Sequence, residues 1–353
     1  MSNEGFGCVE LAERELRVKG IGGAVLVLVK GYTQAPNDLK ICLKLAHCYL
    51  LIQNFSFSYF LYSKVSQEGS PSEKTEAIYG LAELNYQCRN LIPAEYFFQT
   101  VLNTNKDFSM ASSIYLQLGI INKKQGNYQK SLDYLSACSQ FKDHSPAQLN
   151  ELLLQLANTL EMMKNYKQAT EMYIEAAKLN KSCRNLVCLA WIFIKTKRFG
   201  KAETLLIKAS KGVRNCSKEW SDIQFITAIS YFNNRKIKES EKILNELMGF
   251  MPNEPVYCAF YAIFCGYCRQ EQRGVEFLAR ALALFPDRAD FLEIRTEFLG
   301  NEKSESARFD SDKLAIDITE FPFRVQHMNN AGSGFSVSPV LGGRTGFYPV
   351  ESL

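Results

Sequence analysis

The chain has 353 residues, a hydrophobic fraction of 46%, a charged fraction of 22% and a formal net charge of +4. This composition is typical of a folded globular protein, and the small, dispersed net charge gives no electrostatic indication of nucleic-acid binding. The eleven cysteines are an odd number and are scattered, which favours a reducing compartment, and the apolar run at 21–29 is too short to span a bilayer. We therefore expect an intracellular protein, nuclear or cytoplasmic, with no membrane contact.

A helix–turn–helix pattern recurs along the chain and is clearest at 112–148. In its first helix Leu118 and Gly119 lie on one face, and in its second helix Ser131 and Leu135 lie four residues apart. Gly126 falls between the two helices, where a glycine adopts a positive φ at low cost. Small residues let the helices of a pair approach closely, and large residues fill the space between pairs. This is the pattern of the tetratricopeptide repeat (TPR).

The sequence predicts about eight copies of this unit, each close to 34 residues long. In chain order the predicted repeats are 5–38, 39–74, 75–111, 112–149, 150–182, 183–220, 221–254 and 255–288. An amphipathic helix at 289–300 is expected to cap the last repeat, and 301–353 to form a mostly irregular tail. The predicted fold is therefore all-α: a right-handed TPR solenoid spanning 5–300.

The tail contains one segment of different character, 316–325, in which apolar residues alternate. It could fold back on the solenoid, serve as a short motif for a partner, or be an unstructured apolar segment.

The residues offer no catalytic or metal-binding constellation. His47, His144 and His327 have no carboxylate or second histidine at ligand spacing. Cys265 and Cys268 form a CxxC, but it lies at core positions of a repeat helix and lacks the second pair that zinc requires. We therefore predict a protein that is not an enzyme and has no cofactor.

Function is expected to lie on the inner wall of the solenoid, which the first helix of each repeat lines. The wall positions are apolar and aromatic, and an apolar surface of this kind usually marks a binding groove for a helical or extended partner segment. The predicted groove residues are Tyr79, Tyr86, Leu116, Ile120, Lys123, Leu154, Asn158, Val187, Trp191, Phe225, Ile229, Phe232, Ile263 and Tyr267. Aromatic anchors such as Trp191, Phe225 and Tyr267 are expected to dominate binding.

One common TPR ligand is disfavoured by these residues. The chaperone-type TPR clamp holds a terminal carboxylate with Lys and Asn on neighbouring first helices. Asn158 lies at one such position, but Leu154 occupies the place of its lysine.

A closer resemblance is carried by LAHCYLLIQNFSFSY at 45–59 and IYLQLGIINKKQGNY at 114–128. These segments resemble the TPR region of the fungal general transcriptional corepressor, the partner of a Tup-type WD-repeat protein, and that of the UTX histone demethylases. The resemblance covers 39–180. The long Gln-rich and Pro-rich tails of the corepressor are missing, as is the His-x-Asp/Glu of the demethylases.

The resemblance implies a non-catalytic corepressor subunit that binds a WD-repeat protein and DNA-bound repressors, with contacts around 6–86. The alternative is a TPR scaffold subunit of another assembly, such as the anaphase-promoting complex or a ciliary or trafficking complex. In both cases the partners are proteins, without direct contact to nucleic acid.

Overall fold

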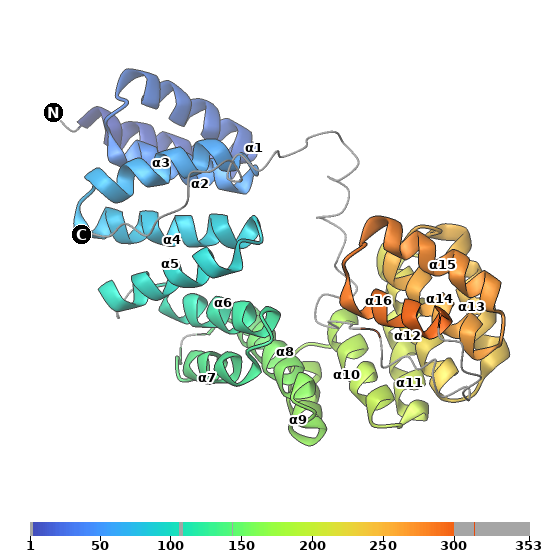
Figure 1. The fold of residues 1–353 in the computed structure, drawn as a ribbon. Helices are drawn as coiled ribbons and strands as arrows, with labels where there is room; N and C mark the ends of the chain where they lie inside the picture. The colour runs from blue at the N-terminus through green and yellow to red at the C-terminus, as the bar shows by residue number, and fades with distance from the viewer. Residues whose placement is uncertain (1–2, 106–108, 143, 300–313, 315–353) are drawn as a thin grey trace. The chain divides into compact units, whose positions relative to one another are not determined.

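The computed structural model describes residues 3–105, 109–142, 144–299 and Leu314. In this part of the chain all regular structure is helical, in sixteen α-helices (Figure 1). The first eight are α1 (Asn3–Gln34), α2 (Leu39–Leu51), α3 (Phe55–Glu68), α4 (Pro71–Gln87), α5 (Leu91–Thr104), α6 (Ala111–Lys124), α7 (Tyr128–Ser139) and α8 (Pro146–Met162). The others are α9 (Tyr166–Leu179), α10 (Cys183–Lys195), α11 (Phe199–Ser210), α12 (Lys218–Asn233), α13 (Ile237–Phe250), α14 (Pro255–Tyr267), α15 (Glu271–Leu284) and α16 (Ala289–Leu299).

The helices pack in consecutive pairs, and the predicted all-α fold of helix–turn–helix repeats is confirmed. First helices pack on the second helices that follow them, as α2 does on α3 and α14 on α15. α1 is itself a pair, because Gly20 breaks it with a φ of 73°. α16 packs on α15 and α14, which is the place expected of a capping helix (Figure 1). The segment 316–325 and nearly all of the predicted tail lie outside the described residues.

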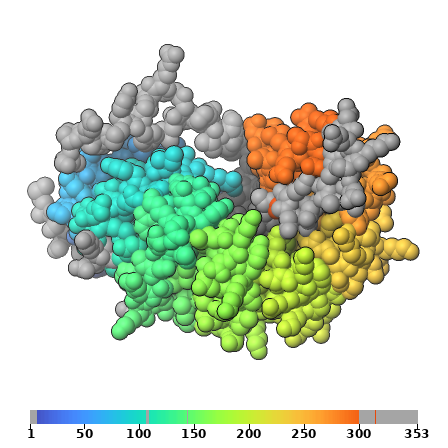
Figure 2. Space-filling model, turned by 60° about the horizontal axis from the view of Figure 1, so that its bottom comes forward, coloured from blue at the N-terminus to red at the C-terminus, as the bar shows by residue number. Residues whose placement is uncertain are grey.

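The chain forms two compact units, Met1–Gln155 and Leu156–Leu353. Helices α1 to α7 belong to the first unit and α9 to α16 to the second, while α8 contains the boundary. In the space-filling view the visible surface of the first unit passes from blue through cyan to green in chain order (Figure 2).

Small residues set the close contact within each pair. In three pairs a serine of the second helix donates its hydroxyl to the carbonyl of a small residue in the first helix: Ser58 to Ala46 at 2.9 Å, Ser131 to Gly119 at 2.7 Å and Ser240 to Ala228 at 2.9 Å. The three serines are fully buried, so these bonds also satisfy hydroxyls that water cannot reach.

The same backbone geometry ends the first helix of each pair from α2 onward. The residue before the second helix's N-cap has a positive φ, and the N-cap amide donates to the carbonyl five residues earlier, as Asn127 does to Asn122 at 2.9 Å. This is the Schellman helix end. At one of these turns the residue is Gly126, the glycine that such a turn prefers. At the other turns it is Gln53, Arg89, Lys164, Lys197, Arg235 or Arg269.

First helices of neighbouring pairs also touch one another, as α2 touches α4 in the first unit and α10 touches α12 in the second. Within each unit the first helices therefore form a layer, which we call the inner layer, and the second helices form the outer layer. In the part of the chain that the structure describes, no helix is long and apolar enough to cross a bilayer.

Candidate functional site

The predicted groove residues lie on first helices of the inner layer, but they differ in whether they reach the surface. Five are half-buried: Tyr79, Tyr86, Leu116, Ile120 and Tyr267. The other nine are buried: Lys123, Leu154, Asn158, Val187, Trp191, Phe225, Ile229, Phe232 and Ile263. Whether any of them contacts a partner stays a prediction; the half-buried group is the one that solvent reaches in the free chain.

Four of the half-buried residues lie on neighbouring helices of the first unit. Tyr79 and Tyr86 come from α4, and Leu116 and Ile120 come from α6. The Tyr79 hydroxyl donates to Glu83 at 2.6 Å, and burial together with this carboxylate raises the pKa of the phenol. We call these four residues the inner row.

A lysine stands at one end of the inner row. The ammonium of Lys124, an exposed residue at the end of α6, lies 5.4 Å from the centre of the Tyr86 ring. This cation–π contact orients the ring and places a positive charge beside the apolar surface. Its neighbour Lys123 is turned inward instead, and donates to the Gln155 side-chain oxygen at 2.8 Å.

In the second unit all the predicted groove residues except Tyr267 are part of the interior. The Trp191 indole N–H donates to Glu161 at 2.6 Å, and the Tyr173 hydroxyl donates to the same carboxylate at 3.1 Å. All three side chains are buried. Glu161 therefore has buried donors to satisfy its charge, which a buried carboxylate requires.

An aromatic cluster fills the next repeats. The Phe225 ring stacks on Tyr257 with centroids 4.5 Å apart, and it meets Phe260 edge to face at 5.6 Å. Phe232 makes similar edge contacts with Phe260 and Tyr267, at 5.6 and 5.1 Å. These contacts explain why Phe225 and Phe232 are inside: first helices of adjacent repeats pack their wall positions against each other.

A buried carboxylate beside this cluster had no signal in the sequence analysis. Asp222 accepts a hydrogen bond from the Tyr257 hydroxyl and lies 3.4 Å from the Lys218 ammonium. Its second oxygen has no hydrogen-bond partner among the described residues. Burial raises the pKa of this carboxyl, opposed by the attraction of Lys218. Only its position, a lone Asp on a face that is otherwise apolar, could have singled it out.

The cysteines and histidines give no chemical site in the described residues. Burial raises the pKa of Cys265 to about 12 and the pKa of Cys258 to about 11. Both thiols therefore stay protonated. The two ring nitrogens of His144 lie 3.3 Å from the Ser112 hydroxyl and 2.9 Å from the Cys138 carbonyl. No group of three metal-ligating side chains occurs in the part of the chain that is described, and His327 lies outside it.

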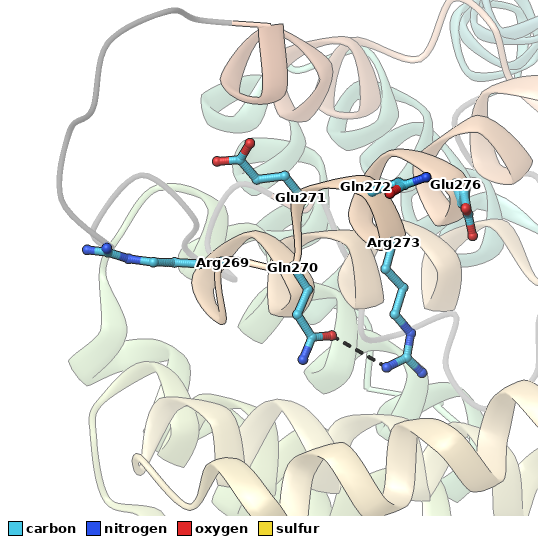
Figure 3. A pocket seen from close by; sticks show the side chains of 6 residues that line it. All are labelled: Arg269, Gln270, Glu271, Gln272, Arg273 and Glu276. Carbon is cyan, nitrogen blue, oxygen red and sulfur yellow. Dashed lines mark hydrogen bonds between the residues drawn. The ribbon is translucent and has the colours of Figure 1, made fainter.

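An open hollow of about 600 Å³ lies at the turn between α14 and α15 (Figure 3). Its lining is polar and balanced in charge: Arg269, Gln270, Glu271, Gln272, Arg273 and Glu276. The Arg273 guanidinium is occupied, because it donates to Gln270 at 3.4 Å and to the Tyr261 hydroxyl at 2.7 Å. The Arg269 side chain extends away from those of Gln270 and Arg273 (Figure 3). This arrangement offers no nucleophile and no preorganised ligand set.

Paired helices, a small residue at each close contact and a repeated helix end define the class: the chain has the fold of tetratricopeptide repeat proteins. The structure is similar to the apo form of RapI, with a TM-score of 0.64, 11% identity, and coverage of 83% of this chain and 90% of that one. It is also similar to the APC/C hetero-tetramer Cut9–Hcn1, with a TM-score of 0.54, 11% identity, and coverage of 79% and 53%. At these identities the likeness shows the fold alone.

Comparison of the sequence gives one more specific likeness. The chain is 38% identical over 102 residues to the mouse (Mus musculus) BBSome complex member BBS4. The matched part is 28% of this chain and 18% of that protein, so the chain spans less than a fifth of the relative's length. No protein-family model matches the chain.

Proposed function

We propose that the protein is a non-catalytic scaffold that binds other proteins as a subunit of a larger assembly. The observation that carries this proposal is the inner row. Tyr79, Tyr86, Leu116 and Ile120 place apolar and aromatic side chains within reach of solvent on two neighbouring helices. Such surfaces on soluble proteins mark interaction sites, and rigid aromatic side chains are common anchors at them.

The assembly we favour is one of the BBSome kind. Support comes from the identity of 38% to a BBSome complex member, which is stronger than the resemblance between distant TPR repeats. The likeness to Cut9 supports only the broader alternative, an assembly built on TPR subunits such as the APC/C. Neither relative is a corepressor, so the resemblance of 39–180 to corepressor repeats, and the nuclear role it implies, gains no support from these relatives.

The inner row is proposed to hold a helical or extended segment of the partner. Its apolar side chains would be covered by apolar residues of that segment, and Lys124 beside Tyr86 would favour an acidic residue at one end. Buried wall residues such as Trp191 and Phe225 would then act indirectly, by keeping the inner layer in place.

The experiment is affinity purification of the tagged chain from its source cells, with quantitative mass spectrometry of the retained proteins. The variant carries Tyr86→Ala and Ile120→Ala, and the matched control carries Ile207→Ala, which removes an exposed apolar side chain of the outer helix α11. We expect the wild type and the control to retain BBSome subunits. With the double variant, the recovered amount of these subunits should fall at least tenfold.

Two results would contradict the proposal. Equal recovery by the double variant and the wild type would remove the inner row as the binding surface. Recovery of APC/C subunits or of a WD-repeat corepressor, in place of BBSome subunits, would keep the scaffold but replace the assembly.

A further inference from the structure

Apolar residues recur at one outward position on the outer helices of the first three repeats. This position is the sixth residue after the N-cap residue, or after Gly20 in α1, and it holds Leu26, Phe60 and Tyr96. The exposed fractions of these residues are 74%, 56% and 52%. A side chain that points outward at the same position in consecutive repeats forms a row across the stack.

The row ends after the third repeat. In the following outer helices the same position holds Asp133, Glu171, Thr204, Lys242 and Glu276. This outward position is therefore polar in the later outer helices, and the apolar row is a local exception that the packing of the repeats does not require. Lys130 of α7 and Glu95 of α5 form an ion pair at 2.6 Å. This pair lies at the end of the row, where the outward position changes from Tyr96 to Asp133.

Two further exposed side chains widen the row into a patch. Phe57 lies three residues before Phe60, and Ile92 lies four residues before Tyr96, so each pair shares a helix face. The exposed fractions of Phe57 and Ile92 are 58% and 77%. We call Leu26, Phe57, Phe60, Ile92 and Tyr96 the outer patch.

Contacts beneath the patch show that its three helices are neighbours. The Lys64 ammonium of α3 donates to the Pro36 carbonyl just after α1, at 2.8 Å. Phe97 of α5 packs against the same apolar cluster as Leu61 of α3.

Two lysines lie beside the patch. Lys30 and Lys64 lie one turn beyond Leu26 and Phe60 on the same faces. The Lys64 ammonium donates to the Pro36 carbonyl and to the Asn37 side-chain oxygen, neither of which carries a charge. At the second, third, sixth and tenth positions after the N-cap residue (Gly20 in α1), these three helices hold no Asp or Glu.

We infer that the outer patch docks an amphipathic α-helix of a partner protein whose apolar face is bordered by Asp or Glu. An extended segment would find only helix side chains here, with no strand edge to pair its backbone, whereas a helix satisfies its own backbone and presents side chains. Acidic residues along the helix complement Lys30 and Lys64. The outer patch is separate from the inner row, so the first unit has two faces for two segments.

The test uses the full chain and two designed peptides of about twenty residues, which as helices are about 30 Å long. Both carry Leu and Phe at helical spacing on one face; one has Glu along the border of that face and the other has Lys. Fluorescence anisotropy of the labelled peptides measures binding. We expect the Glu peptide to bind at least tenfold more tightly than the Lys peptide, with the difference shrinking as salt is added.

Variants connect this binding to the patch. Phe60→Glu should weaken the binding of the Glu peptide at least tenfold. Lys30→Glu should reduce the difference in affinity between the Glu peptide and the Lys peptide. Ile207→Glu is the matched control, because it places the same charge at an exposed apolar site of similar exposure, 57%, on α11. Circular dichroism should show the same helical content in all variants, since the replaced side chains are on the surface.

The inference is overturned if the Glu peptide does not bind, if both peptides bind equally, or if Phe60→Glu leaves binding unchanged. Sedimentation supplies the remaining check. A wild type that self-associates, together with a monomeric Phe60→Glu variant, would show that a second copy of this chain covers the patch, and the assignment to a partner helix would be wrong.

Discussion

The indole N–H of Trp191 donates to the carboxylate of Glu161 at 2.6 Å, with both side chains almost completely removed from solvent. Trp191 belongs to α10 and Glu161 to the end of α8, and Tyr173 of α9 donates to the same carboxylate at 3.1 Å. One charged group thus joins three consecutive helices. A residue that looks like a surface anchor in the sequence is, in the structure, part of a buried hydrogen-bond network.

The network predicts a stability cost for Trp191→Phe. Phenylalanine keeps an aromatic ring but removes the N–H that donates to Glu161, and hydrogen bonds to charged groups contribute about 1.5–3 kcal/mol. We expect the free energy of unfolding to fall by about 2–3 kcal/mol in urea titrations followed by circular dichroism.

Trp220→Phe is the matched control. Trp220 is half-buried and meets Phe250 edge to face at 5.9 Å, so its replacement should cost less than about 1 kcal/mol. Equal losses for the two tryptophans would mean that the bond to Glu161 contributes nothing specific.

Gly80 is predicted to tolerate no side chain. A Cβ built on this residue of α4 would overlap the ring of Tyr62, which packs against it from α3. Because Tyr62 is 3% exposed and closely surrounded, its ring has little room to move. Gly80→Ala should therefore destabilise the chain by about 1–3 kcal/mol, as overpacked core sites do.

The comparison for Gly80 is Gly200→Ala. Gly200 lies in the first turn of α11, and a Cβ there would meet no atom within 4 Å. The gain in helix propensity should leave that variant as stable as the wild type or up to about 1 kcal/mol more stable. Thermal unfolding of both variants distinguishes the close contact from a general effect of alanine.

The turn residues with a positive φ predict a substitution that increases stability. Lys164 has a φ of 60° and an exposed side chain at the turn between α8 and α9. Glycine adopts this conformation without the steric strain of a Cβ, which costs roughly 1–2 kcal/mol. Part of that gain is lost because glycine is freer in the unfolded chain, so Lys164→Gly should stabilise by about 0.5–1 kcal/mol. The reverse change at the equivalent site, Gly126→Lys, should destabilise by a similar amount.

These turns also show which parts of the fold could be predicted from the sequence. The pairing of small residues, such as Gly119 with Ser131, has a fixed spacing, and it predicted the repeats and the turn at Gly126. The other left-handed positions were not predicted, because Arg89 and Lys197 have no preference for positive φ; tertiary packing of the two helices imposes it.

The site was predicted less completely than the fold, for a physical reason. Helical spacing indicates which residues face the inner side, but it does not say how closely neighbouring first helices approach. Tyr86 and Phe232 occupy equivalent positions of their helices, yet Tyr86 is half-buried and Phe232 is 5% exposed. The difference comes from the rings of Phe260 and Tyr267 against Phe232, contacts between residues distant in sequence.

The raised pKa of Asp222 predicts a pH dependence of stability. Burial holds the folded-state pKa above the unfolded value near 3.8, so the folded state binds this proton more strongly. This contribution to stability is complete below the unfolded pKa and is lost as the pH rises through the folded pKa. The stability of the wild type minus that of Asp222→Asn should therefore decrease as the pH is raised from about 3.8 towards neutrality. Urea titrations of both proteins over that range measure it, and a difference that increases with pH would show that Lys218 outweighs burial.

Phe225 and Phe60 predict how the interior and the outer patch respond to the same change. Phe225 is fully buried between Tyr257 and Phe260, so Phe225→Ala removes a large side chain from a packed interior and should cost about 3–5 kcal/mol. Phe60 is 56% exposed, and Phe60→Ala should change stability by less than about 0.5 kcal/mol. Chemical unfolding of the two variants in parallel gives both values. If Phe225→Ala were as mild as Phe60→Ala, the first helices of the second unit would not be packed together as the structure has them, and Phe225 would again be available as a binding residue. A large loss from Phe60→Ala would instead show that the outer patch is covered within the chain itself, leaving no surface there for a partner helix.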